Sequence, residues 1–139
     1  MILVASSDPD PGSPIMARTA VTYSKLVPNG RLTDPAGTTI DSTLVTNGVV
    51  IDAADPEHTL IRVTNSAGGA KNVTVKAGTG REAWMAAAGD VVSSVGASGA
   101  AFIGPFTSAR FQQRGSKLHV DFESGTTGTI TVFKLPKAY

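Results

Sequence analysis

The stretch that decides the fold covers residues 58–77 and reads HTLIRVTN, then SAGGA, then KNVTVKA. In its first part Ile61 and Val63 share one parity, and in its last part Val73 and Val75 do the same. Apolar residues at every second position predict β-strands with one dry and one wet face. We expect the two strands to form a hairpin around the Gly-Gly turn. A second layer must cover its dry face, because an isolated hairpin is only marginally stable in water.

The composition extends this expectation to the whole chain. The 139 residues are 41% hydrophobic and include 15 glycines and eight prolines. The chain is also rich in Thr, Val and Ser and has few runs at helical spacing, and such a composition favours short strands and turns. We therefore predict an all-β fold, a single antiparallel β-sandwich of jelly-roll-like type.

Further short strands follow at regular spacing, as is typical of a sandwich. The expected strands are residues 19–27, 44–51, 91–95, 101–103, 109–113, 117–122 and 129–135. The stretch 44–51 is either one bulged strand or a tight hairpin, and residues 31–43 are expected to be a loop. Residues 81–88 are expected to be helix or loop, ended by Gly89. The expected second core layer consists of Ala109, Phe111, Leu118, Val120, Phe122, Ile130 and Val132.

Residues 1–18 are predicted to be an extended N-terminal arm, and residues 19–139 the sandwich domain. The segment SSDPDPGSP at residues 6–14 holds three prolines and little that a core could bury. Met16 is an alternative start of the natural chain.

The charge is close to balanced overall but uneven along the chain. With only 12 lysines and arginines and a net charge of +1, no basic stripe is available for a nucleic-acid backbone. Residues 1–60 hold seven acids and three bases, and the remainder holds four acids and nine bases. This asymmetry indicates either ordinary solubility or an acidic N-terminal part that lies on a basic surface of a neighbouring copy.

Targeting signals and cysteine chemistry are not indicated. The chain has no cysteine, which excludes disulfides and thiolate sites. The opening MILVA is too short for a signal sequence, and no apolar run reaches transmembrane length. We expect an intracellular product with no membrane partner.

No catalytic or cofactor-binding motif stands out. His58 and His119 belong to no HxH or HExxH pattern, and no G-x-S-x-G elbow accompanies the serines. Asp52, Asp55 and Glu57 form the one close carboxylate group, for which solvated turn residues are the preferred interpretation and a calcium site the alternative. We expect a protein that is not an enzyme and has no cofactor and no metal.

Apolar residues in places expected to be wet are more informative. Trp84 and Met85 lie in a Gly-bounded excursion, and Phe133 and Leu135 have the parity opposite to the core residues of their strand. Such residues either fold back over the core or act as anchors of a protein–protein interface.

From Met16 onward the succession of turn and strand phrases resembles small structural proteins of tailed bacteriophages, especially those that infect actinobacteria. The resemblance rests on TYSKLVPNG (22–30), DPAGTTID (34–41), LIRVTN (60–65), VTVKAG (73–78), FIGPFTSARF (102–111), VDF (120–122) and GTITVFKLP (128–136). It covers nearly all of residues 16–139 and has no counterpart for residues 1–15.

The resemblance implies a capsid decoration protein, made in the host cytoplasm, that binds the major capsid protein on the outside of the shell. A homo-oligomer, with a trimer favoured, would suit local three-fold positions. The expected partner contacts are Pro9, Pro11, Pro14, Ile15, Trp84, Met85, Phe133, Leu135 and Tyr139. The alternatives are a tail, neck or head-fibre protein of the virion and, in another class, a glycan-binding β-sandwich module.

Overall fold

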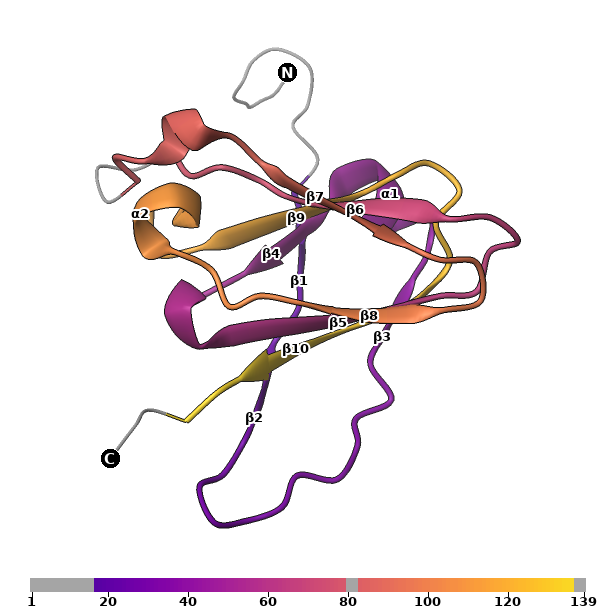
Figure 1. The fold of residues 1–139 in the computed structure, drawn as a ribbon, viewed down its shortest axis with the longest axis horizontal. Coiled ribbons are helices and arrows are strands. Elements are labelled where there is room, and N and C mark those ends of the chain that lie inside the picture. Colours follow the sequence, from indigo (N-terminus) through magenta and orange to yellow (C-terminus); the bar gives the residue numbers. More distant parts are fainter. Residues whose placement is uncertain (1–16, 80–82, 137–139) are drawn as a thin grey trace, which may run out of the picture.

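The computed structural model describes residues 17–79 and 83–136, and its strands form two mixed sheets whose buried faces share one core (Figure 1). Sheet A contains, in spatial order, β1 (Thr19–Ala20), β4 (Val49–Ile51), β9 (Leu118–Phe122), β6 (Lys71–Val75) and β7 (Val91–Val95). Sheet B contains β2 (Tyr23–Lys25), β10 (Gly128–Lys134), β5 (Thr59–Asn65) and β8 (Ala100–Ile103), and β3 (Thr38–Ile40) also pairs with β10. The short helical segments are α1 (Ser42–Asn47), η1 (Pro56–His58), η2 (Ala86–Ala88) and α2 (Ser108–Phe111). The predicted all-β character is confirmed.

β5 and β6 do not form the expected hairpin. β5 pairs with β10 and β8 in sheet B, whereas β6 pairs with β9 and β7 in sheet A. The connection at residues 66–70 therefore crosses from one sheet to the other, at the right-hand end of Figure 1. The predicted alternation is confirmed, since Ile61, Val63, Val73 and Val75 are all buried. A period-2 pattern identifies the buried face of a strand but not the strand beside it, so it fits both arrangements.

Asn65, the last residue of β5, ties this crossing to the end of β7. Its buried amide donates hydrogen bonds to the carbonyl oxygens of Val95 and Gly96, at 3.0 and 3.2 Å. It also donates to the Gly69 carbonyl at 2.9 Å, and its Oδ1 accepts from the Ala67 N–H at 2.9 Å. One buried side chain thus holds two connections between the sheets together.

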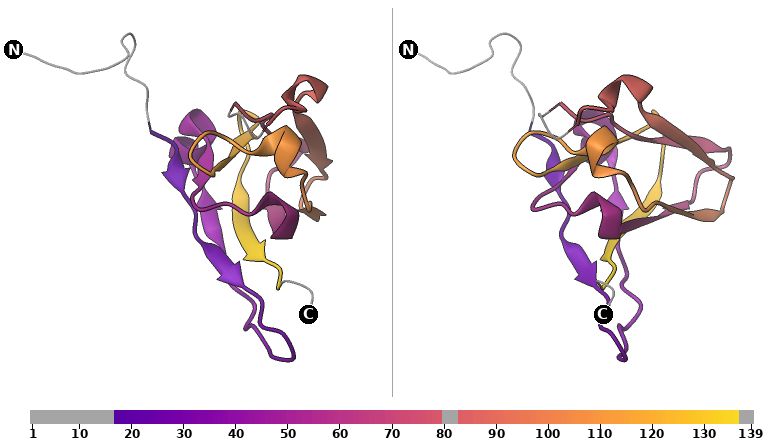
Figure 2. Two further views of the ribbon diagram at one scale, coloured as in Figure 1. Left: turned by 90° about the vertical axis from the view of Figure 1, so that its left-hand side faces the viewer. Right: turned by 60° about the vertical axis from the view of Figure 1, so that its left-hand side comes forward.

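The predicted first strand, residues 19–27, is two short strands, one in each sheet. β1 pairs in parallel with β4, and β2 pairs in parallel with β10, so the expectation of antiparallel sheets throughout is wrong. Val21, between the two strands, is buried, and the Tyr23 hydroxyl lies 2.7 Å from the Thr59 hydroxyl. Figure 2 shows this indigo segment as one extended run along a side of the molecule. It passes from sheet A to sheet B and covers the core on that side.

The expected strand or hairpin at residues 44–51 is a helix followed by a strand. Asp41 Oδ1 accepts a hydrogen bond from the Leu44 N–H at 3.0 Å, which makes Asp41 the N-cap of α1. Gly48 ends the helix with a φ of 82°, a conformation that glycine adopts without steric cost. The Asn47-Gly48 pair is therefore a helix end and not a hairpin turn.

The expected strand at residues 109–113 is also wrong, because α2 occupies most of it. Phe111 is nevertheless buried as predicted, and its ring meets that of Phe106 edge to face, with the ring centroids 5.5 Å apart.

The expected loop at residues 31–43 contains β3 and the start of α1. The expected strands at 91–95, 101–103, 117–122 and 129–135 correspond to β7, β8, β9 and β10.

Replacing Asn65 by alanine should lower the free energy of unfolding by about 2–4 kcal/mol. The change removes several buried hydrogen bonds, each contributing about 1 kcal/mol, and leaves their backbone partners unsatisfied. Urea unfolding measures the loss. Asn72→Ala, at an exposed position of β6, is the matched control and should cost little. Equal losses in the two variants would contradict the role of Asn65.

Candidate functional site

The loop at residues 83–89 presents an aromatic side chain to solvent. Trp84 is 78% exposed and Met85 is 39% exposed, whereas Ala83 directly before them is buried. In Figure 1 this loop lies beside α2, at the end of the molecule opposite the crossing connections. Two of the residues predicted to contact a partner are therefore available on the surface.

The backbone of this loop is held by the segment around α2. The Met85 N–H donates to the Ala109 carbonyl at 2.7 Å. The guanidinium of Arg110 donates through Nε to the Gly89 carbonyl at 2.9 Å and lies 4.9 Å from the centroid of the Phe111 ring. The backbone directly after Trp84 is therefore anchored, and Ala83 directly before it is buried, which preorganises the position of Trp84.

Phe133 and Leu135 lie on the outer face of sheet B but are less available than predicted. Phe133 is only 8% exposed, because the Arg62 guanidinium lies over its ring, 5.6 Å from the centroid. Arg62 is in turn held by the Asp34 carboxylate at 2.6 Å and the Pro35 carbonyl at 2.8 Å. Of the two interpretations that the sequence left open, cover by the fold is the one that describes Phe133, and Leu135 is half-buried.

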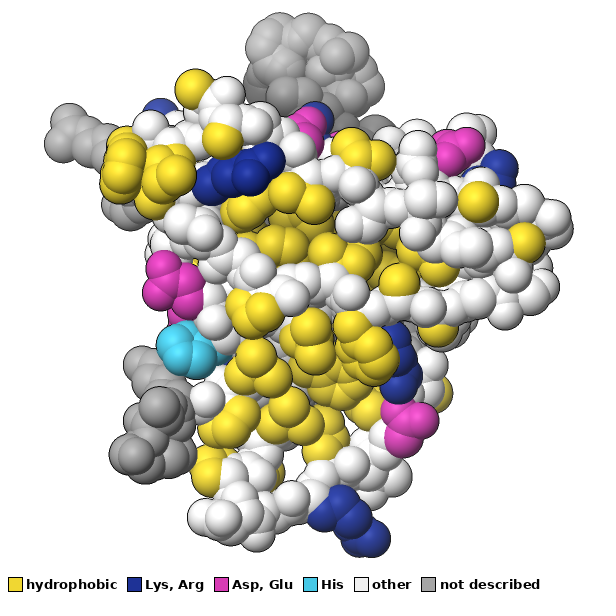
Figure 3. Space-filling view, viewed as in Figure 1, with side chains coloured by type: hydrophobic (Ala, Val, Ile, Leu, Met, Phe, Trp, Pro, Cys, Tyr) yellow, Lys and Arg dark blue, Asp and Glu magenta, His cyan; other side chains and the backbone are white. Residues whose placement is uncertain are grey.

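Besides Val27 in the loop after β2, two exposed large apolar residues of the described chain, both on strands, were not among the predicted contacts. Phe102 on β8 is 62% exposed and Val92 on β7 is 58% exposed. Each has the parity opposite to the buried residue of its strand, Ile103 or Val95, and that alternation was the available signal. Figure 3 shows hydrophobic side chains gathered over sheet B and between the two sheets on the face toward the viewer.

The other predicted contacts, Pro9, Pro11, Pro14, Ile15 and Tyr139, lie outside the described residues. Arg18, which the sequence assigns to the arm, is attached to sheet A. Its guanidinium donates to the Val49 and Val120 carbonyl oxygens, each at 3.3 Å, and forms an ion pair of 2.6 Å with Asp121.

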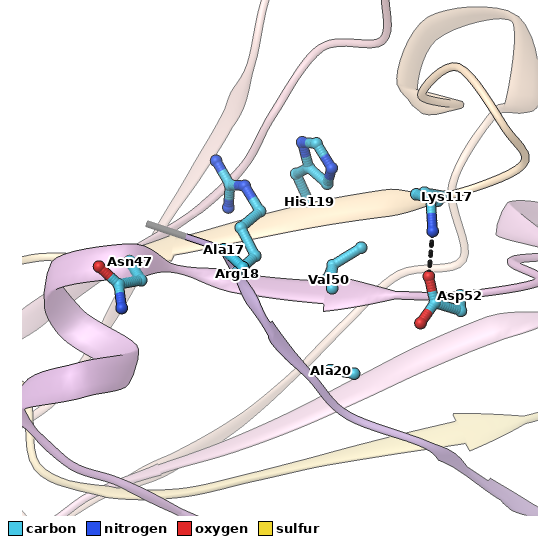
Figure 4. Close-up of a pocket in the computed structure, with 8 residues that line it drawn as sticks. All are labelled: Ala17, Arg18, Ala20, Asn47, Val50, Asp52, Lys117 and His119. Carbon is cyan, nitrogen blue, oxygen red and sulfur yellow. Dashed lines mark hydrogen bonds and ion pairs between the residues drawn. The ribbon is translucent and has the colours of Figure 1, made fainter. Parts of the chain in front are cut away.

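A concavity of about 580 Å³ lies on the outer face of sheet A beside β1 (Figure 4). Its lining is Ala17, Arg18, Ala20, Asn47, Val50, Asp52, Lys117 and His119. Val50 belongs to β4, and Asp52 directly follows that strand. His119 belongs to β9, and Lys117 directly precedes β9. Small and apolar side chains make much of its floor, and the charged groups stand at its ends.

The charges of this concavity neutralise one another. Lys117 forms an ion pair with Asp52, and Arg18 forms one with Asp121. No serine, threonine or cysteine is among its described lining residues, so it brings no hydroxyl or thiol nucleophile beside His119. This arrangement supports neither acyl transfer nor the capture of a strongly charged ligand.

The pKa of His119, which lies among these ion pairs, is lowered by its surroundings. Burial lowers its pKa below the ordinary value of 6.5, and the positive charge of Arg18 lowers it further. The Asp121 carboxylate acts in the opposite direction, and the Lys117 ammonium adds to the lowering.

The carboxylates considered for calcium do not converge. Asp52 pairs with Lys117, and Asp55 lies 3.0 Å from His58 Nδ1. Across residues 17–79 and 83–136, no three His, Cys, Asp or Glu side chains are grouped to hold a metal ion.

Comparisons with protein-family models, with curated proteins and with solved structures found no match for this chain. None of the helices in the described part of the chain is long and apolar enough to cross a membrane.

His119→Gln should become more stable relative to the wild type as the pH falls. Since the pKa of His119 is lower in the folded than in the unfolded chain, the unfolded chain takes up the proton first, which destabilises the wild type below about pH 6.5. Urea unfolding at about pH 7.5 and about pH 5 measures the difference between the two proteins. A difference that is the same at both pH values would contradict this account.

Proposed function

We propose that this protein is a non-enzymatic structural protein that binds neighbouring protein subunits through apolar side chains at the margins of its two sheets. The observation that carries the proposal is Trp84, which is 78% exposed on a loop whose backbone is anchored to the segment around α2. Tryptophan is among the residues that most often dominate binding energy at protein interfaces.

The physical reason is the low cost of ordering this loop on binding. A mobile loop loses conformational entropy when it docks, whereas an anchored one has already lost most of it during folding. Burying the Trp84 ring then contributes its full apolar area to the complex. Met85, next to it, enlarges the same apolar surface.

The setting of the proposal is the outer surface of a tailed-bacteriophage capsid, with the major capsid protein as the partner. It is supported by the turn and strand phrases between residues 16 and 139 that resemble phage structural proteins. Many copies on one shell would multiply a modest affinity by avidity and oppose rupture of the shell. We include in this proposal the description of the two sheets as one jelly-roll-like sandwich, because both face a single core.

Two alternatives differ in what they require. A tail, neck or head-fibre protein would use the same kind of contact in far fewer copies. A glycan-binding module needs an aromatic platform beside its polar groups, and the described lining of the concavity near His119 contains no Trp, Tyr or Phe. We therefore favour protein binding over glycan binding.

Trp84→Ala should weaken retention on shells of the major capsid protein by about tenfold or more, the effect of losing one interface hot spot. Co-sedimentation with shells over a concentration series measures the retention, and thermal unfolding measures the fold. Val27→Ala is the matched control, because Val27 is 55% exposed in another loop. Retention that is unchanged in Trp84→Ala, or lowered equally in both variants, would reject Trp84 as the anchor.

A further inference from the structure

The longest uncharged stretch of the described chain forms one side of the molecule. Residues 91–109 contain no Asp, Glu, Lys or Arg, although the chain has 12 bases and 11 acids. The stretch begins with β7, continues through the connection at residues 96–99 into β8, and ends within α2.

Both strands of this stretch lie at a sheet edge. β7 is the last strand of sheet A and β8 the last strand of sheet B among the described residues. An edge strand has unpaired backbone N–H and C=O groups, and proteins that must stay monomeric protect such edges with charges, proline or bulges. β8 reads Ala-Ala-Phe-Ile, and it has neither a charge nor a proline.

The side chains of this uncharged side are also apolar and accessible. Val92 on β7 and Phe102 on β8 are more than half exposed. Val91 and Ala101 are half-buried and pack against the core at the same side. In Figure 3 the hydrophobic atoms between the two sheets continue onto sheet B. Apolar residues that run from the core to an open edge are typical of an interaction surface.

We propose that the β7–β8 side, residues 91–103, binds the same side of a second copy of this chain, with the two β8 edges paired antiparallel across a two-fold axis. A two-fold contact brings the same surface of both copies together, so an edge that carries charges of one sign would repel itself. The uncharged stretch removes that repulsion, which is the electrostatic condition for self-association. Joining the β8 edges satisfies their backbone groups and places the two Phe102 rings on one face of a continuous sheet.

Charge also argues against other partners for this side. A nucleic acid or a strongly charged protein gains affinity from opposite charges, and residues 91–103 offer none; Arg62, opposite Phe102 on β5, is already paired with the Asp34 carboxylate. The inference goes beyond the proposed function, because it names a contact between copies and not the contact with a shell. It also gives a dimer where the sequence led us to expect a trimer.

The test is the mass of the full chain in solution, measured by light scattering during gel filtration over a concentration series. The wild type should have twice the monomer mass of 14.2 kDa at high concentration. Phe102→Glu and Val92→Glu should each raise the dimer dissociation constant by about tenfold or more, because each adds the same negative charge to both copies of an apolar contact. Val27→Glu is the control, at a similarly exposed valine outside this side, and should remain dimeric.

Thermal unfolding shows whether each variant is folded, and the two glutamate variants test the same side independently. A wild type that is monomeric or trimeric would overturn the inference, as would a dimer that both glutamate variants retain. A dimer lost on deleting residues 1–15, with both glutamate variants still dimeric, would assign the contact to that segment instead. Because shell retention is measured separately, failure of the dimer leaves the proposed function standing, and the reverse also holds.

Discussion

The structure depends on burying the inner faces of β5 and β6 in one core, to which they contribute from opposite sheets. Ile61 and Val63 come from sheet B, and Val73 and Val75 come from sheet A, and all four are buried in the one core. The crossing between the strands is held by Asn65, whose amide satisfies backbone groups of two connections. With both strands placed in this way, the remaining strands extend each sheet from them.

The sequence predicts well which face of a strand is buried, and poorly which strands pair with each other. Alternation reports which face of a strand is dry, and the faces of β5, β6 and β9 agree with it, whereas β10 is buried on both faces from Ile130 to Phe133. It carries no information on pairing, so the stretch at residues 58–77 was interpreted as a hairpin although its strands belong to different sheets. α1 was missed because Asp41 and Gly48, which begin and end it, are equally typical of turns.

The candidate contact residues show the same difference between what local patterns report and what depends on contacts between distant segments. Trp84 and Met85, in the Gly-bounded excursion, are exposed, and their loop is anchored by contacts with α2, which lies more than twenty residues away in sequence. Phe133 has the outward parity but is covered by Arg62, a contact between strands that no local pattern reports. Phe102 lay within a predicted strand and has the parity opposite to Ile103, which signals its outward direction, whereas the edge position of β8 is revealed only by the sheet order.

The proposed role in binding other proteins rests on an exposed tryptophan whose loop is anchored to the segment around α2 and on an apolar side formed by β7 and β8. The proposed capsid role is tested most directly by the number of copies of the chain per virus particle. Quantitative mass spectrometry of purified particles, from a phage whose genome encodes the chain, determines this number. A decoration protein should be present in numbers comparable with those of the major capsid protein. A few copies, a dozen, or none in the particle would contradict the account.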